Sequence, residues 1–254
     1  MVTQKYIPTD GVMKMCEYDT FTTEGLDATK WQALQLPMGE GRTWSYGDPA
    51  AKVKAKNGTM EITVNPFRLK HDEIHMFDDP KHLLVTPQVL EVAEDGTTQV
   101  SCEMACDTYN GNSDDLLDGM IGLVVADFSQ GMVFDWVLSA TRLGIIYERL
   151  PIAGVTPEDG SFTHVIQSPF VARNRPREFH RYVVALNRSE RSCEWLVDSR
   201  RFFMVRDLPV DVQSITLGLI VSTLKAPEPG RGSISSHGQG ATGYWRHLTI
   251  STSR

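Results

Sequence analysis

The sequence has few of the features that mark membrane, secreted or nucleic-acid-binding proteins. No apolar run approaches the roughly 20 residues that a membrane-spanning helix needs, and residues 1–10 contain no apolar core of a secretory signal. The arginine-rich stretches at 173–177 and 188–206 are flanked or interrupted by acidic residues, and the formal net charge is -7. We therefore expect a cytoplasmic protein that has neither a membrane nor a nucleic acid as its partner.

Cysteine is scarce as well, with 4 among the 254 residues. Cys102 and Cys106 would share one face of a strand at a separation of roughly 13 Å, which is too far for a disulfide. Their spacing has no second pair of ligands to match it, so it is a poor zinc signal. We therefore expect reduced thiols, in keeping with a cytoplasmic protein.

Motifs for cofactors and metals are largely missing. The chain has no phosphate-binding glycine loop and no flavin or nicotinamide fingerprint, so we expect no cofactor. His71 and His75 lie four residues apart, but Pro66 and Pro80 flank them and favour a loop with a surface pair over a metal site. The acidic stretch 107–115 has a calcium-like composition without the spacing of an EF-hand, which favours a solvated turn.

Helical periodicity is also missing, whereas short alternating or β-branched segments recur between turns such as Asn-Gly and Asp-Gly. The predicted strands are residues 52–56, 59–64, 83–92, 98–104, 122–128, 132–139, 143–149, 164–167, 179–186, 192–197, 215–222 and 244–251. Many short strands at this spacing predict an all-β sandwich or barrel. The whole chain, residues 1–254, is expected to form one domain.

The three central strands, within residues 122–149, are almost entirely apolar or aromatic. The polar exceptions are Asp127, Asp135, Arg142, Tyr147, Glu148 and Arg149. An ionised side chain in an apolar strand costs several kcal/mol unless it has a partner or faces a wet cavity. We therefore interpret this block as the floor of a binding cleft.

Asp135 is the first catalytic candidate of that block. Burial beside Val133, Trp136 and Val137 would raise its pKa toward neutrality and suit it to general acid or base chemistry. A structural ion pair with an arginine of the next strand explains the same residue equally well.

Tyr147 and Arg149 share one face of the third strand, with Glu148 on the other. Beside Asp135 they would form a catalytic set that handles protons and binds an anion. A cross-strand salt bridge is the simpler explanation for Arg149.

Four segments of the chain occur in the same order as in a known fold superfamily. They are Asp19-Thr-Phe21 with Leu26-Asp27-Ala-Thr-Lys-Trp31, Gly58 to Val64, Glu178 to Val184 with Trp195 to Arg201, and Tyr244 to Ile250. These segments resemble the concanavalin A-like jelly rolls of the laminarinase and lichenase type. In that superfamily a Phe and a Trp of the first segment fill the space between the sheets. The resemblance implies an all-β fold, a two-sheet antiparallel jelly-roll β-sandwich.

Glycosidases of that superfamily carry Glu-x-Asp-x-(x)-Glu on one strand, with all carboxylates on the concave face. The matching strand here keeps only Asp135, and Val133 and Val137 stand where the two glutamates would be. A retaining glycosidase needs two carboxyl groups about 5–5.5 Å apart. We therefore expect no ordinary glycoside hydrolysis from this strand, and a more apolar ligand in contact with the two valines.

The block 127–151 is also similar to jelly-roll proteins of fungal and actinomycete biosynthetic clusters, and to cofactor-free fungal cyclases of the hetero-Diels–Alderase kind. This similarity implies a cofactor-independent enzyme of secondary metabolism that binds an apolar or polyaromatic small molecule in the concave cleft. Asp135, Tyr147 or Arg149 would help water leave a hydroxylated precursor. Proximity would then supply most of the rate of cyclisation.

Further site candidates lie around the block. His180 is expected either at the cleft, as a catalytic residue, or at the edge of the core, and Arg142 is expected to contact the substrate. Trp44, Tyr46 and Trp245 would offer aromatic faces to it.

The alternative function is a carbohydrate-binding, lectin-like module or a divergent glycoside hydrolase, with the same three aromatic residues as stacking platforms. A structural or interaction protein is a third hypothesis. The exposed edge strands of a sandwich would also permit a homodimer.

Overall fold

The computed structural model describes residues 14–37, 41–68, 81–112, 114–168, 173–225 and 237–253. Within these ranges the regular secondary structure consists of strands alone. No helix there is long and apolar enough to cross a membrane. The all-β prediction is confirmed.

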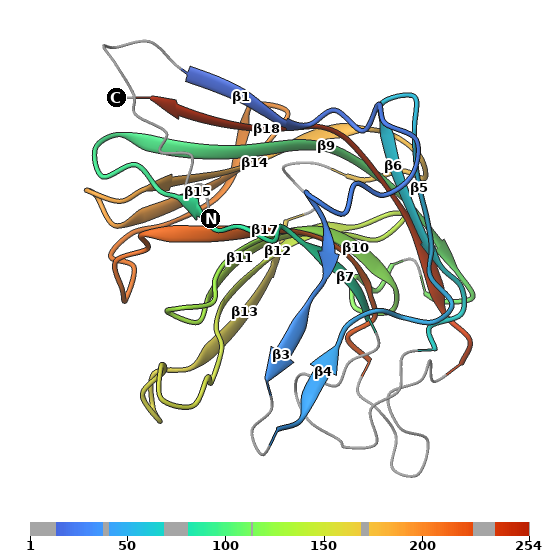
Figure 1. The fold of residues 1–254 in the computed structure, drawn as a ribbon, viewed down its shortest axis with the longest axis horizontal. Coiled ribbons are helices and arrows are strands. Elements are labelled where there is room, and N and C mark those ends of the chain that lie inside the picture. Colours follow the sequence, from blue (N-terminus) through green and yellow to red (C-terminus); the bar gives the residue numbers. More distant parts are fainter. Residues whose placement is uncertain are drawn as a thin grey trace.

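Two large antiparallel sheets and one small hairpin make up the fold (Figure 1). Sheet A contains, in spatial order, β16 (Arg200–Val205), β15 (Ser192–Val197), β14 (His180–Asn187), β9 (Thr97–Tyr109), β18 (Gly240–Ser253), β6 (Thr59–Val64) and β5 (Lys52–Lys56), with β1 (Lys14–Asp19) also paired to β18. Sheet B contains β13 (Phe162–Gln167), β12 (Leu143–Arg149), β11 (Met132–Leu138), β10 (Met120–Asp127), β17 (Ser214–Ser222), β7 (Lys81–Val85) and β2 (Gln32–Ala33), with β8 (Leu90–Glu91) also paired to β17. The hairpin consists of β3 (Gln35–Pro37) and β4 (Thr43–Ser45).

The predicted strands agree closely with the observed ones. The strands at 52–56, 59–64, 143–149 and 192–197 have the predicted bounds, and the others differ mainly at their ends. The segment 83–92 divides into β7 and β8 at a bend, because its residues pair with different parts of β17. The strands that the sequence did not predict are β1, the short β2, β3 and β4, and β16.

The first segment of the jelly-roll resemblance fills the space between the sheets as expected. Phe21 and Trp31 are each 1% exposed, and their rings stack with centroids 6.3 Å apart. The Trp31 indole N–H donates to Asp19 Oδ2 at 2.8 Å, which satisfies the polar atom of a buried ring. The apolar faces of both sheets close around these rings.

Candidate functional site

Strand β11 presents its two faces to different surroundings, and this division defines the candidate site. Phe134 and Trp136 lie in the core between the sheets. Because side chains alternate along a strand, Val133, Asp135 and Val137 point to the opposite, outer face of sheet B. The cleft predicted from the sequence, on the concave face that carries Asp135, would therefore lie on this outer face.

Two apolar clusters cover this outer face on either side of Asp135. The first contains Val133, Trp44 of the β3–β4 hairpin and Tyr46, which follows that hairpin. Its other members are Leu83, Val85, Val124, Ala126 and Ile220. The second joins Val137 to Leu116, Met120 and Ile146. Asp135 therefore lies in a strip between two packed regions and is 7% exposed.

The Asp135 carboxyl also replaces part of the backbone ladder. Among these described strands, β10 and β11 pair up to Leu123–Trp136 and again from Ala126–Val133, with no pairing between. In that gap the Val125 N–H donates to Asp135 Oδ1 at 3.2 Å. Burial raises the pKa of Asp135 well above its ordinary value of 3.8, the Val125 bond opposes the shift, and Glu148 adds to it.

Glu148 is the second carboxyl on the same outer face. It lies opposite Val133 on β12, whereas Asp135 lies opposite Ile146, so the two acids are diagonal cross-strand neighbours with Cα atoms roughly 7–8 Å apart. Desolvation raises the pKa of Glu148, while a hydrogen bond from Thr163 at 2.6 Å and the charge of Lys81 oppose the rise. The two carboxyls thus have different environments, an arrangement that separates an acid from a base.

The expected set of Asp135 with Tyr147 and Arg149 does not form. Tyr147 belongs to the core between the sheets, and Arg149 shares its face of β12. Both therefore point away from Asp135, and Glu148 takes the place beside it. The sequence had identified Glu148 as the residue on the other face. It could not decide which face met Asp135, because β10 and β11 are buried on both faces.

The three aromatic residues predicted to contact the ligand also lie on opposite sides of sheet B. Trp44 and Tyr46 pack against Val133 on the outer face and are 7% and 1% exposed. Trp245 is 0% exposed in the core between the sheets, where its indole N–H donates to the Gly122 carbonyl at 3.2 Å. Trp245 therefore cannot be a stacking platform for a ligand in this fold.

His180 and Arg142 lie away from Asp135. His180 is on β14 of sheet A, where its Nδ1 lies 2.6 Å from Asp198 Oδ2. Arg142 lies in the turn after β11, and its Nε is 3.3 Å from Asp114 Oδ1. The ion pair ties that turn to the loop that carries Leu116.

The acidic stretch uses its carboxylates within the protein. Asp107 accepts from Arg177 Nε at 2.7 Å, Asp114 pairs with Arg142, and Asp115 pairs with Lys225. No group of three or more potential metal ligands occurs in the described part of the chain. The predicted surface pair, residues 71 and 75, lies outside the described residues. The four cysteines are free thiols, and burial raises the pKa of Cys102 and Cys106.

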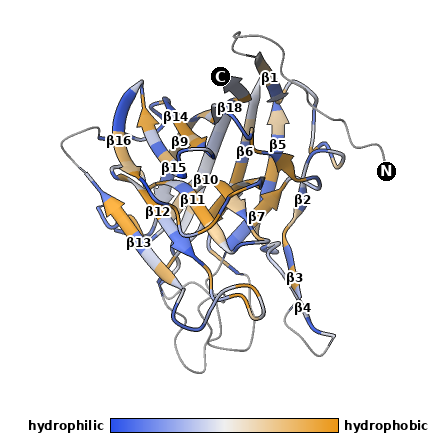
Figure 2. Cartoon of the chain, turned by 90° about the vertical axis from the view of Figure 1, so that its left-hand side faces the viewer, coloured by the Kyte–Doolittle hydropathy of each residue, from blue (hydrophilic) through white to orange (hydrophobic). Residues whose placement is uncertain are grey.

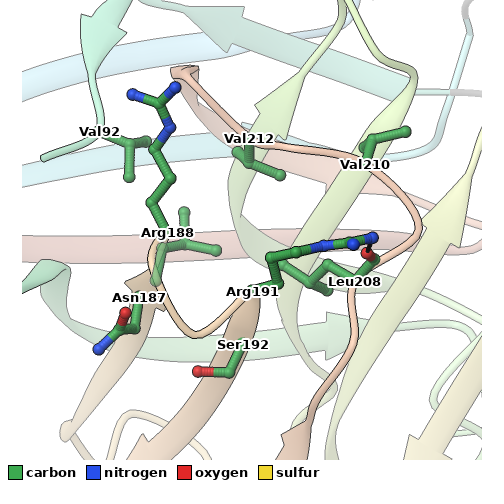
Figure 3. A pocket seen from close by; sticks show the side chains of 9 residues that line it. Val92, Asn187, Arg188, Arg191, Ser192, Leu208, Val210 and Val212 are labelled. Atoms are coloured by element: carbon green, nitrogen blue, oxygen red, sulfur yellow. Dashed lines mark hydrogen bonds between the residues drawn. The ribbon is translucent and has the colours of Figure 1, made fainter. Parts of the chain in front are cut away.

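A small cavity lies elsewhere, and none of its lining residues comes from β10, β11 or β12 (Figure 3). Arg188 and Arg191 supply its charged groups. The guanidinium of Arg188 is held by Asp211 through two hydrogen bonds of 2.7 Å, and Arg191 donates to the Leu208 carbonyl. Both cations of this cavity are therefore engaged within the protein.

The fold with its two sheets is the jelly-roll β-sandwich of the laminarinase and lichenase type. Similar solved structures are an endo-1,3-β-glucanase from Streptomyces sioyaensis (12% identity, 99% of this chain and 100% of the other, TM-score 0.57) and the catalytic domain of a laminarinase from Thermotoga petrophila RKU-1 (14%, 95% and 97%, TM-score 0.56). Porphyranase B from Zobellia galactanivorans is another (16%, 98% and 96%, TM-score 0.55). Identities this low show the fold alone.

The chain belongs to the family of unknown function DUF6081, whose model matches residues 18–254. No curated protein matches its sequence.

Proposed function

We propose that this protein is a cofactor-independent enzyme that uses Asp135 and Glu148 as an acid–base pair on an apolar small molecule. The observation that carries the proposal is the Asp135 carboxyl, buried between two apolar clusters with a second carboxyl diagonal to it. The valine and isoleucine side chains beside this carboxyl favour an apolar ligand over a polar one. Burial raises the pKa of this carboxyl, so it holds its proton more firmly than an exposed aspartate, which suits it to donate a proton in such surroundings.

The reaction best suited to this pair is a dehydration that prepares a cyclisation. Asp135 donates its proton to a substrate hydroxyl, the C–O bond breaks, and the bond's electron pair leaves with water. Burial raises the pKa of Glu148, while Thr163 and Lys81 oppose the rise, and Glu148 in its ionised form accepts a proton from a phenol of the same substrate. The product is a quinone methide, which an alkene held beside it can trap by hetero-Diels–Alder addition. Solvent returns the proton from Glu148 to Asp135.

The proposal is tested with an o-hydroxybenzyl alcohol and an alkene partner, with the cycloadduct followed by mass spectrometry. Asp135→Asn and Glu148→Gln are each expected to lower the rate by about 10²–10⁴-fold, the range for loss of general acid or base catalysis. Glu194→Gln is the matched control, because Glu194 pairs with Arg201 on sheet A. An unchanged rate in Asp135→Asn would remove Asp135 from the reaction.

The second candidate is a carbohydrate-binding module or divergent glycoside hydrolase. The likeness of the fold to glucanases favours it, as does the presence of two carboxyls on the concave face. Against it, the surrounding side chains are apolar, and Val133 and Val137 stand where the resemblance predicts the glutamates of a retaining glycosidase. Strong binding on a glycan array, lost in Glu148→Gln, would favour this second function over the first.

A further inference from the structure

Arg149 is a buried cation whose hydrogen bonds are incomplete. It lies at the end of β12, opposite Met132 and Phe162, on the face that meets the core. The residue is 9% exposed, and its Nε has no hydrogen-bond partner. No ion pair involves it within the described residues. A buried guanidinium in this condition costs several kcal/mol unless an anion or another acceptor meets it.

Asp127 is the acid nearest in register to Arg149. The two residues flank Met132 in one cross-strand row, so their Cα atoms are roughly 10 Å apart. Asp127 Oδ1 is used by Ser129, which donates both its backbone N–H and its hydroxyl. Asp127 Oδ2 has no partner. The acid therefore balances part of the charge from a distance without satisfying the guanidinium.

Tyr147 lies next to Arg149 on the same face of β12, and Trp195 of the facing sheet contacts Tyr147. The hydroxyl of Tyr147 makes no hydrogen bond within the described residues, and burial raises the pKa of Tyr147 to about 12, so the hydroxyl stays protonated at neutral pH. The Trp195 indole N–H is fully buried without a partner. The two rings meet edge to face with centroids 6.0 Å apart. Three polar groups on two facing sheets thus lack acceptors.

Aromatic rings surround these donors at one edge of the sandwich. Tyr147 lies 4.8 Å from Phe162 and 6.1 Å from His164 of β13, and Trp195 lies 5.9 Å from Phe203 of β16, centroid to centroid. β13 and β16 are the outermost strands of their sheets and lie on the same side of the molecule (Figure 2). His164 is exposed, so this edge is the approach from solvent.

We propose that this edge of the sandwich binds a small aromatic carboxylate beside Tyr147 and Arg149. The guanidinium of Arg149 meets the carboxylate, the Tyr147 hydroxyl donates to it, and the ligand ring packs against Phe162 and His164. A carboxylate suits the planar fork of an arginine, which can donate two parallel hydrogen bonds to it. The site lies on the opposite face of β12 from Glu148, so it is separate from the proposed acid–base pair and does not depend on it.

Calorimetric titration with benzoate tests the binding, with benzyl alcohol as the neutral analogue. Wild-type protein is expected to bind benzoate and not benzyl alcohol. Arg149→Met and Tyr147→Phe are each expected to weaken benzoate binding at least tenfold. Arg201→Met serves as the control, because Arg201 pairs with Glu194 outside the core. Absence of benzoate binding, or equal binding by Arg149→Met, overturns the proposal, as does tighter binding of inorganic phosphate than of benzoate.

A thermal melt without ligand separates this role from a structural one. If the role of Arg149 is to bind an anion, Arg149→Met removes a buried charge that is unsatisfied in the ligand-free protein. The midpoint of thermal unfolding then stays the same or rises. If Arg149 instead stabilises Asp127, Arg149→Met and Asp127→Asn each lower the midpoint, and the double variant falls no further than either. That second outcome overturns the proposal.

Discussion

Asp135→Asn is expected to make the protein more stable at neutral pH and to leave its stability unchanged below about pH 4. The folded state holds the Asp135 proton more tightly than the unfolded chain, because burial raises its pKa well above 3.8. The unfolding free energy of the wild-type protein is therefore undiminished below the pKa that Asp135 has in the unfolded chain. It falls as the pH rises from there toward the pKa of Asp135 in the folded state. The loss amounts to about 1.4 kcal/mol per pH unit in that window. An asparagine has no charge to desolvate, and its side-chain oxygen can still accept from Val125.

Urea denaturation of both proteins from pH 4 to pH 8 measures this effect. The difference in unfolding free energy should widen with pH and then level off above the folded pKa. Glu194→Gln, on the outer side of sheet A, should show no such widening. Parallel pH profiles for wild type and Asp135→Asn would mean that Asp135 is ionised in the fold, and would also remove the proton donor from the proposed reaction.

Trp245→Ala is expected to lower the unfolding free energy by about 3–5 kcal/mol, a large part of the 5–15 kcal/mol available to a folded domain. The ring is fully buried between the sheets, and its N–H donates to Gly122. Gly243 makes room for it, since a β-carbon there would lie 2.1 Å from the ring. Chemical denaturation followed by far-UV circular dichroism measures the loss.

Trp245→Phe is the matched control, because it keeps most of the apolar contact and loses the hydrogen bond. Its cost should be clearly smaller than that of Trp245→Ala. A stacking platform for sugars would behave differently, since replacing an exposed ring barely changes stability and abolishes glycan binding. Near-normal stability in Trp245→Ala would therefore contradict the core position of this residue.

The first and last residues of several strands could be predicted, because turn-forming residues in the sequence separate these strands from their neighbours. The strands at 52–56 and 59–64 are separated by an Asn-Gly turn, and both turn residues adopt positive φ angles. β3 and β4 carry weaker signals. They are three residues each, and the contact of Trp44 with sheet B belongs to the tertiary structure.

The candidate site was only half predictable. Asp135 was identified because an acid among valines is costly, and the structure gives it a buried hydrogen bond and a raised pKa. The residues expected beside it, Tyr147 and Arg149, face the core, and Glu148 lies beside Asp135 instead. Alternation correctly separated Glu148 from Tyr147 and Arg149. Because both faces of β11 are apolar, however, nothing in the local pattern linked one face of β12 to Asp135.

The sequence by itself determined the all-β class and most strand positions, and it has valine at 133 and 137, where the resemblance to glycosidases predicts carboxylates. These properties depend on neighbours along the chain, through alternation and turn residues. Only the tertiary structure decided that Glu148 joins Asp135, that Tyr147 and Arg149 face the core, and that Trp245 is buried. Those outcomes depend on which face of each strand meets the second sheet, and strands that are apolar on both sides leave that choice to packing.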